Sequence, residues 1–372
     1  MGPTNMNAPH DEHIARLALA SIEGMGAARF EGLLWEFGAA QQAIAANITA
    51  LRTVVGVSLT MAERIIGQRD ALDTVRARWD ALHARGVTAR FRDEPAYPDA
   101  LRKIPDAPPL LLSWGLDGLI PERSLAIVGT RRPCPEALEA ADHVARVARA
   151  DGWCVVSGLA RGTDAAAHRA AIDGTAAGEW ASIAVLGHDL TAIYPPEHRQ
   201  LAVDVGRVGA VVSERLIADV RGRHLVKRNR IISGLCRGIM LIQSGREDGA
   251  LHTARFADAQ RRDVAVWDPA ALSVESAGAA ELVSRGRRFY DAASISDWLA
   301  HLDSQTEFPN PMLLFDRSDQ RAGAYWREAR EAVELGGGCD ADAAVPDYAA
   351  LHGLGRGPGA CGCPWEADFE GK

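Results

Sequence analysis

Positive charges and glycines at separate places in this sequence have the types and spacing needed to bind phosphate groups. The densest feature is a basic run with five full positive charges within ten residues, in a chain whose formal net charge is −8. Its members are Arg221, Arg223, His224, Lys227, Arg228 and Arg230. A charge run is usually solvated, but the apolar stretch Ile231–Gly234 follows this one at once. Because the run leads directly into a folded unit, we favour contact with an anionic ligand over a solvated loop.

Two glycine turns supply further groups of the same kind. Gly129 follows the apolar segment 125–128 and precedes Arg131, Arg132 and Pro135, where a helix is expected to begin. The second turn reads SGLARGTD and contains Ser157, Gly158, Arg161 and Gly162. A glycine lets the backbone approach a ligand closely, and a helix N-terminus carries a partial positive charge. Both turns therefore predict contacts with an anion.

Acid–base catalysis has one candidate pair. Asp164 and His168 lie at positions i and i+4 of a predicted helix and share a face. The alternative is that Thr163 or Asp164 caps this helix and His168 forms a hydrogen bond beneath the turn. We favour the alternative because no positioned nucleophile is evident: Ser157 and Ser233 neighbour glycines, but neither lies in a G-x-S-x-G elbow. No catalytic residue is expected.

Cofactors and metals find little support in the motifs. The sequence lacks both G-x-G-x-x-G and G-x-x-x-x-G-K-[ST], so neither dinucleotide binding of the usual kind nor a P-loop is expected. Cys339, His352, Cys361 and Cys363 could supply four zinc ligands, but the C-x-C spacing and the glycine-rich surroundings favour reduced thiols in a flexible tail. We therefore expect no cofactor and no metal site.

The elements that would position the cations form a repeated pattern. From Leu125 to Asp268, short apolar runs rich in Val, Ile and Ala alternate with glycine-bearing turns and helix-length segments. This alternation predicts an α/β fold with a doubly wound, mostly parallel sheet. Loops that leave the carboxyl ends of parallel strands converge on one crevice. Cations far apart in the sequence, such as Arg131 and Lys227, are therefore expected to meet there, with the basic run as a loop that enters a helix or turn at 229–234.

A helical unit is expected before the sheet, at about residues 11–85. Gly24 and Gly26 form a predicted tight turn between two helices, which resembles a helix-hairpin-helix element, and a weaker copy follows with Thr60 as a cap. Such hairpins can bind phosphate through backbone N–H groups. Packing or partner docking is favoured here, because Arg29 is the only cation near the turn. A proline-rich, extended segment then leads to the sheet, and Tyr97 is expected to pack against it.

Length and composition fit a protein of two or three domains. The chain has 372 residues, of which 47% are hydrophobic, enough for a substantial core. The expected divisions are a disordered N-terminus at 1–10, the helical unit at 11–85, the sheet domain at 86–303 and a partly disordered tail at 304–372. The N-terminus lacks the pattern of a secretory leader, and no apolar run is long enough for a membrane helix. A cytoplasmic location without membrane contact is expected.

Five motifs in this order resemble the DNA-processing protein A (DprA/Smf) family. They are IVGTRRP, VVSGLARGTDAAAHRAA, IAVLGHDLTAIYPPEHRQLA, KRNRIISGL and ALHTARFADAQRRDVAVW. The resemblance covers about residues 95–300. It implies an extended Rossmann-like fold that binds single-stranded DNA, forms a homodimer and loads the RecA recombinase during natural transformation. It implies no catalytic reaction.

Site residues follow from the resemblance position by position. The matching positions are Gly129, Arg131, Ser157, Gly158, Gly162, Lys227, Arg228, Asn229, Arg230 and Ser233, and Arg132 and Arg161 are predicted to bind DNA beside them. Arg131 and Arg132 would hold phosphates from one turn, while Lys227, Arg228 and Arg230 would clamp the backbone from the other side. Binding would then be indifferent to base sequence and weakened by salt. The family usually has an aromatic residue where this chain has Leu225 and Val226, so an expected stacking platform is missing.

Two other classes of function stay open at this point. One is a Rossmann-like nucleotide-binding enzyme or sensor, such as a nucleotide phosphoribohydrolase of the lysine-decarboxylase-like (LOG) group. Its P-G-G-x-G-T-x-x-E signature is absent, and Glu214 is the nearest substitute for its glutamate. The other is a protein-interaction scaffold with a vestigial pocket, against which the intact basic run speaks.

Overall fold

One mixed sheet organises the molecule. The computed structural model describes residues 8–217, 222–272, 274, 276–285, 288–305 and 308. Nine strands within these residues form the sheet: β1 (Thr88–Phe91), β2 (Leu110–Gly115), β3 (Ser124–Val128), β4 (Cys154–Ser157), β5 (Ser182–Leu186), β6 (Gly209–Ser213), β7 (Gly238–Leu241), β8 (Asp263–Trp267) and β9 (Phe289–Tyr290). Their order is β1-β2-β6-β5-β4-β3-β7-β8-β9.

The chain path explains where the loops converge. It starts in the middle of the parallel part at β3, moves outward through β4, β5 and β6, and then returns across the sheet to β7, β8 and β9 on the other side. A ligand crevice is expected where the strand order reverses, outside the carboxyl ends of the strands. Only β1 and β2 run antiparallel to their neighbours among the described strands. The predicted doubly wound, mostly parallel sheet is confirmed.

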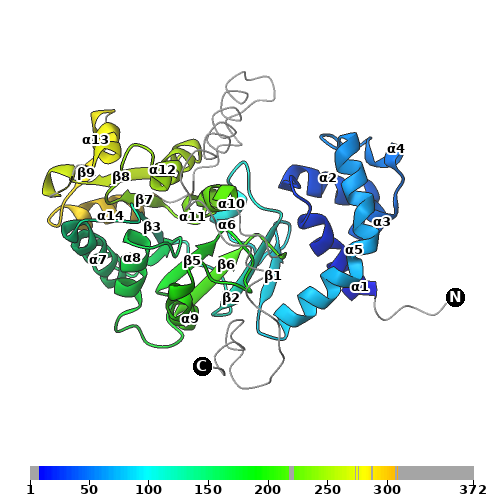
Figure 1. Ribbon diagram of the computed structural model, residues 1–372, viewed down its shortest axis with the longest axis horizontal. Coiled ribbons are helices and arrows are strands. Elements are labelled where there is room, and N and C mark those ends of the chain that lie inside the picture. Colours follow the sequence, from blue (N-terminus) through cyan, green and yellow to red (C-terminus); the bar gives the residue numbers. More distant parts are fainter. Residues whose placement is uncertain are drawn as a thin grey trace.

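Helices cover both faces of the sheet (Figure 1). Apolar side chains of the parallel strands point alternately to the two faces, as strands buried on both sides require. One face packs against α6 (Asp99–Arg102), α11 (Asn229–Gly234), α12 (Gly249–Ala259) and α13 (Ala277–Ser284). The other packs against α7 (Pro135–Ala150), α8 (Thr163–Ile172), α9 (Arg199–Arg207) and α14 (Ile295–Asp303). The remaining helices here are α10 (Gly222–Lys227) and the 3-10 turns Pro196–His198 and Pro269–Ala271.

Five helices precede the sheet in the part of the chain that begins at residue 8, as expected for a small all-α unit. They are α1 (Ala8–Ala20), α2 (Ala27–Phe37), α3 (Ala40–Ala45), α4 (Ile48–Leu51) and α5 (Leu59–His83). Arg29 joins the two hairpin turns, because its guanidinium donates to the carbonyl oxygens of Gly24, at 2.6 Å, and Gly56, at 2.7 Å. Ser58 caps α5, so the expected cap at Thr60 is wrong. The side chain of Ser58 reaches the N–H of Met61, whereas Thr60 already lies inside the helix.

The proline-rich segment is more structured than the expected extended lead-in. It contains the antiparallel strand β2 and follows β1, with α6 between them. Tyr97 is fully buried and donates its hydroxyl to the Pro108 carbonyl at 2.8 Å, which confirms its expected packing. Phe91 of β1 stacks on Phe30 of α2, with ring centroids 5.9 Å apart, and so joins the helical unit to the sheet edge.

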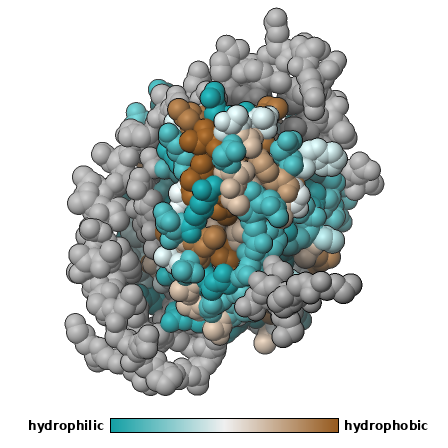
Figure 2. Space-filling model, turned by 90° about the vertical axis from the view of Figure 1, so that its right-hand side faces the viewer, coloured by the Kyte–Doolittle hydropathy of each residue, from teal (hydrophilic) through white to brown (hydrophobic). Residues whose placement is uncertain are grey.

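Apolar side chains also lie on the outside of the helical unit. Figure 2 shows brown atoms gathered in a band on this face of the molecule. The large exposed apolar residues of the unit are Trp35, Ile48, Val55 and Leu59. The expected domain boundaries at 10, 85 and 303 stay predictions, and the tail with its cysteines lies outside the described residues.

Candidate nucleic-acid interface

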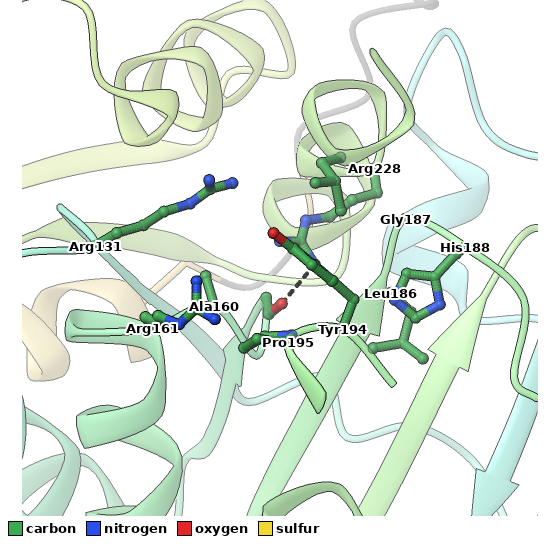
Figure 3. Close-up of a pocket in the computed structure, with 11 residues that line it drawn as sticks. Arg131, Ala160, Arg161, Leu186, Gly187, His188, Tyr194, Pro195 and Arg228 are labelled. Carbon is green, nitrogen blue, oxygen red and sulfur yellow. Dashed lines mark hydrogen bonds between the residues drawn. The ribbon is translucent and has the colours of Figure 1, made fainter. Parts of the chain in front are cut away.

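A pocket opens at the carboxyl ends of β4 and β5, where the sequence predicted that distant turns would meet (Figure 3). The inner space of the pocket that water can reach has a volume of about 20 Å³. The volume is about 380 Å³ when the open mouth is included. The pocket can therefore take in one phosphate or the edge of one base and leave the rest of a ligand on the surface. Its lining consists of Arg131, Gly158, Ala160, Arg161, Leu186, Gly187, His188, Tyr194, Pro195, Leu225 and Arg228.

Arg228 is the cation built into the pocket wall. Its side chain is buried, and Nη1 donates to the main-chain carbonyls of Gly158, at 2.7 Å, and of Val185. Nε donates to Oδ1 of Asn229 at 3.0 Å. Burial lowers the pKa of Arg228 to about 10, against the attraction of Asp164, and the group still carries its charge at neutral pH. No carboxylate forms a hydrogen bond with this guanidinium among the described residues, so a positive charge remains for an anion.

Arg131 faces the same pocket from the loop after β3. Figure 3 shows the guanidinium of Arg131 on one side of the pocket and that of Arg228 on the other, where it overlaps the Tyr194 ring in this view. Arg131 is exposed and makes no hydrogen bond or ion pair with any described residue. The two guanidinium groups repel each other. A phosphate between them would remove this repulsion and form charge-assisted hydrogen bonds.

The other predicted cations of the two turns differ in their partners. Arg132 is exposed next to Arg131. Arg161 also lines the pocket, but its Nε lies 2.5 Å from Oε1 of Glu197, with both side chains about half exposed. An exposed ion pair of this kind is weak and can exchange for a phosphate.

The predicted glycines bring the loops into close contact. A Cβ on Gly129 would lie 2.5 Å from the Thr163 hydroxyl, and one on Gly162 would lie 2.6 Å from the Thr130 carbonyl. Gly162 also has a φ of +75°, which favours glycine. On Gly158, a Cβ would lie only 2.3 Å from Nη2 of Arg228. These three glycines therefore permit the packing of the pocket loops, whatever further contact they make with a ligand.

Asp164 and His168 have separate structural partners. Oδ2 of Asp164 accepts hydrogen bonds from the N–H groups of Gly158, at 3.1 Å, and Ala160, at 3.3 Å, so it fixes the loop and does not cap α8. His168 is buried, with Nδ1 2.7 Å from the Ser182 hydroxyl. Burial lowers the pKa of His168 to about 3, which keeps the ring neutral. Both observations favour the structural role that we preferred for this pair.

The basic run is helical at 222–227, where the sequence predicted a loop, and the helix or turn expected at 229–234 is a helix. The run forms α10 and α11, which lie on the return connection from β6 to β7. Helices form here because the apolar residues Ile231 and Ile232 are buried against the sheet and fix the orientation of the run. Arg221 and the side chain of Arg223 lie outside the described residues.

Arg230 points into the molecule, away from a clamping position. Its side chain is only 4% exposed and binds Glu214 through two hydrogen bonds, of 2.6 and 3.0 Å, and Asp106 at 3.2 Å. Burial opposes its charge, but these two carboxylates outweigh burial and raise the pKa of Arg230. The geometry thus argues against the expected phosphate contact. Lys227 is half-buried, and its charge is attracted to the same two carboxylates.

Three further predicted residues hold α11 and the loops. Asn229 is buried and donates Nδ2 to the Gly249 carbonyl at 3.2 Å. The Ser233 hydroxyl donates back to the carbonyls of its own helix, and that of Ser157 donates to the Ile127 carbonyl at 2.7 Å. Their side chains are engaged inside the fold. The structure therefore places them behind the pocket surface.

Tyr194 is one of the pocket residues that the sequence reasoning did not predict. It lies in the loop after β5, where a cis peptide bond joins it to Pro195. Its side chain lines the same pocket as Leu225, which stands where the resemblance led us to expect an aromatic residue. The signal lies in the sequence, because YPP follows an apolar run and its turn, whereas the resemblance predicts an aromatic residue only beside the basic run.

Metal and membrane sites are not found in the described part of the chain. No group of three or more His, Cys, Asp or Glu side chains there could hold a metal ion. None of its helices has the length and apolarity that crossing a bilayer requires. Cys339, His352, Cys361 and Cys363 lie outside the described residues, so the choice between zinc and reduced thiols is untested.

Known proteins that are similar in sequence to this chain carry the names Smf and DprA. Protein Smf of Synechocystis sp. is 34% identical over 255 residues, which cover 67% of this chain and 62% of that protein. DNA processing protein DprA of Bacillus subtilis is 33% identical over 210 residues, which cover 56% of this chain and 69% of that protein. The chain therefore spans about three fifths of the length of Smf.

Solved structures agree on the fold. DNA processing protein A of Streptococcus pneumoniae matches with a TM-score of 0.61 at 25% identity, covering 77% of this chain and 97% of that chain. The protein of the same name from Helicobacter pylori, described for its single-stranded DNA binding mode, matches with a TM-score of 0.52 at 23% identity, covering 59% and 97%. The family model of DNA recombination-mediator protein A matches residues 88–302. The chain therefore belongs to the DNA recombination-mediator protein A family.

Proposed function

We propose that this protein binds single-stranded DNA, with one phosphate held between Arg131 and Arg228. The observation that carries the proposal is the pair of guanidinium groups that face one pocket, of which Arg131 has no hydrogen-bond partner among the described residues. The membership of the chain in the DNA recombination-mediator protein A family also supports DNA as the ligand. The Helicobacter pylori relative is described as binding single-stranded DNA, and we extend that ligand to this chain.

The pocket suggests how one nucleotide is held. Main-chain carbonyls hold the Arg228 side chain in place before a ligand binds. The side chain therefore loses little conformational freedom when it binds phosphate. Arg131 is exposed and closes over the phosphate from the other side. The Tyr194 ring offers a face on which a base can stack. Such contacts do not distinguish between bases, so binding is expected to be indifferent to sequence.

Fluorescence anisotropy with an oligo-dT probe over a range of salt concentrations tests this proposal. The plot of log K against log salt is expected to have a slope of about −0.7 for each neutralised phosphate. The variant Arg131→Gln should make the slope shallower by about 0.7 and weaken binding about fivefold at 0.1 M salt. Arg169→Gln is the matched control, because Arg169 is exposed in the last turn of α8, away from the pocket.

Two results would contradict the proposal. One is a wild-type protein that does not bind oligo-dT at low salt, and the other is an Arg131→Gln variant that binds with the affinity and slope of wild type. A purified protein that releases free base from nucleoside monophosphates would favour the hydrolase alternative. Glu214, the nearest substitute for the catalytic glutamate of that class, is bound to buried Arg230, which speaks against this reaction.

The proposal also includes two activities and an oligomeric state. The protein would protect single-stranded DNA, load RecA and form a homodimer. They are supported by membership of the family, whose model is that of a DNA recombination-mediator protein. We expect the purified protein to retain RecA on a DNA-coated surface and to elute from a sizing column as a dimer. A RecA filament assay in the presence of single-strand-binding protein would test the loading activity directly.

A further inference from the structure

A second basic groove lies between α12 and α13, on the face of the sheet that also carries α11. The space for water inside it is about 300 Å³, far more than in the pocket beside Tyr194. The apolar lining residues of the groove are Leu251 and Leu282, and its charged lining residues are Arg246, Arg255, Arg285, Asp258 and Glu281. Arg255 belongs to the motif ALHTARFADAQRRDVAVW, whereas Arg246 and Arg285 lie outside the five family motifs.

Two of the three arginines in this groove keep their charge available. Arg285 is bound by Glu281 at 2.5 Å, four residues earlier in α13. Arg246 and Arg255 are exposed and make no hydrogen bond or ion pair with any described residue. Two such guanidinium groups can bind the phosphates of a nucleotide backbone.

The groove is preformed. The Ser244 N–H donates to the Ser276 hydroxyl at 3.0 Å, and the Gly278 N–H donates to the Ser244 carbonyl at 2.9 Å. A Cβ on Gly278 would lie 2.3 Å from the Gly245 carbonyl, so the start of α13 sits directly on the loop after β7. The loop that carries Arg246 is thereby fixed against α13 and needs no rearrangement to accept a ligand.

The groove continues the row of cations that begins at the pocket. β4, β3 and β7 are successive neighbours in the sheet, and their carboxyl-end loops carry Arg161, then Arg131 and Arg132, then Arg246. The loops after β3 and β7 touch, because the Thr130 N–H donates to the Gln243 carbonyl at 2.8 Å. Neighbouring strands lie about 4.8 Å apart, so cations on successive loops can contact one DNA backbone as it crosses the sheet.

We propose that the DNA strand leaves the pocket across the loops after β3 and β7 and that its next phosphates bind Arg246 and Arg255 in the groove. This inference rests on the proposed function and adds the direction and length of the bound strand. It predicts that a short oligonucleotide fills only the pocket, whereas a longer one also occupies the groove.

The test compares oligo-dT of about four nucleotides with oligo-dT of about 20 nucleotides on wild type and on Arg246→Gln/Arg255→Gln. For the long probe, we expect the double variant to lose about 1.4 from the salt slope and to bind on the order of 25-fold more weakly at 0.1 M salt, as two unneutralised phosphates require. For the short probe, its affinity should equal that of wild type. Arg169→Gln again serves as the control, and thermal melts check that both variants fold.

Each outcome separates the groove from the pocket. If the double variant binds the long probe like wild type while Arg131→Gln does not, the groove inference is wrong and the proposed function stands. An equal loss for both probes also overturns it, because the substitutions would then act on the pocket. If wild type binds neither probe, the proposed function itself fails.

Discussion

Two neighbouring arginines of the basic run show how burial and partners decide what a charge can do. Arg228 is held by neutral main-chain carbonyls and keeps a charge at the pocket surface. Arg230 is held by Glu214 and Asp106, and these two carboxylates neutralise its charge inside the fold. Removing Arg230 should therefore act on stability first, whereas removing Arg131 should act on DNA affinity.

The ion pair at Arg230 predicts an acid-dependent contribution to stability. Burial opposes the charge of Glu214, but Arg230 outweighs it and lowers the pKa of Glu214 to about 2, from an ordinary value of 4.5. Because the pKa is lower in the folded state, the stabilisation is present above pH 4.5 and is lost as the pH falls toward 2. Its size is about 3 kcal/mol at neutral pH.

Glu214→Gln should accordingly unfold at lower denaturant concentration than wild type at pH 7, by a free energy of about 3 kcal/mol. The difference should stay constant down to about pH 4.5 and then shrink by about 1.4 kcal/mol per pH unit. Denaturant titrations of both proteins between pH 7 and pH 3 measure this. A difference that grows on acidification would show that Glu214 is protonated in the folded protein at neutral pH.

At the scale of elements, the loop after β4 and the start of α11 depend on each other. Gly158 has no side chain, and Arg228 fills the space that a side chain would occupy. The segment 222–234 thus reaches the pocket only because the loop after β4 leaves room for it. This explains why the sequence pairs a glycine turn with a basic run some 70 residues later.

Gly158→Ala should weaken DNA binding by pushing the Arg228 guanidinium away from its carbonyl partners. The new Cβ would lie between 2.3 and 2.8 Å from three atoms of that group. We expect a loss of affinity of about tenfold, which corresponds to about 1.4 kcal/mol for one charged contact. Gly67→Ala is the control, since a Cβ at Gly67 meets no atom within 4 Å. Unchanged affinity in Gly158→Ala would mean that Arg228 does not contact the strand.

Sequence reasoning reached the parallel core but missed features that depend on tertiary contacts. The strands and turns from Leu125 onward follow from local alternation of apolar runs and glycines, and the structure confirms them. β1 and β2 could not be predicted from the sequence, because prolines lie close to them. They are strands only through their antiparallel pairing at the edge of the sheet. The inward orientation of Arg230 depends on Glu214 and Asp106, which no spacing rule connects with it.

At the scale of the whole molecule, the helical unit supports one wall of the pocket. Arg78 of α5 binds the carboxylate of Asp189, which is buried in the loop after β5, and donates to the Thr191 hydroxyl at 2.6 Å. It also donates to the Leu216 carbonyl at 3.4 Å, on the connection that leads to α10. His188, the neighbour of Asp189, lines the pocket. One side chain of the helical unit therefore holds two segments next to the site.

Arg78→Ala should lower DNA affinity more than a matched loss of an ion pair elsewhere on the same helix. Arg76→Ala provides that match, because Arg76 binds Asp11 within the helical unit, at 2.9 Å. We expect similar melting temperatures for the two variants and a DNA dissociation constant at least several-fold higher for Arg78→Ala alone. Equal affinities would show that the helical unit does not position the pocket.

Arg131, Arg132 and Arg246 lie along the edge at which the parallel strands β3 and β7 end, in a protein whose formal net charge is −8. Such a molecule is an electric dipole, which repels a polyanion over most of its surface and attracts it at that edge. The electric field would orient an approaching DNA strand toward this edge before any contact forms. Because salt screens that field, the association rate should fall as ionic strength rises.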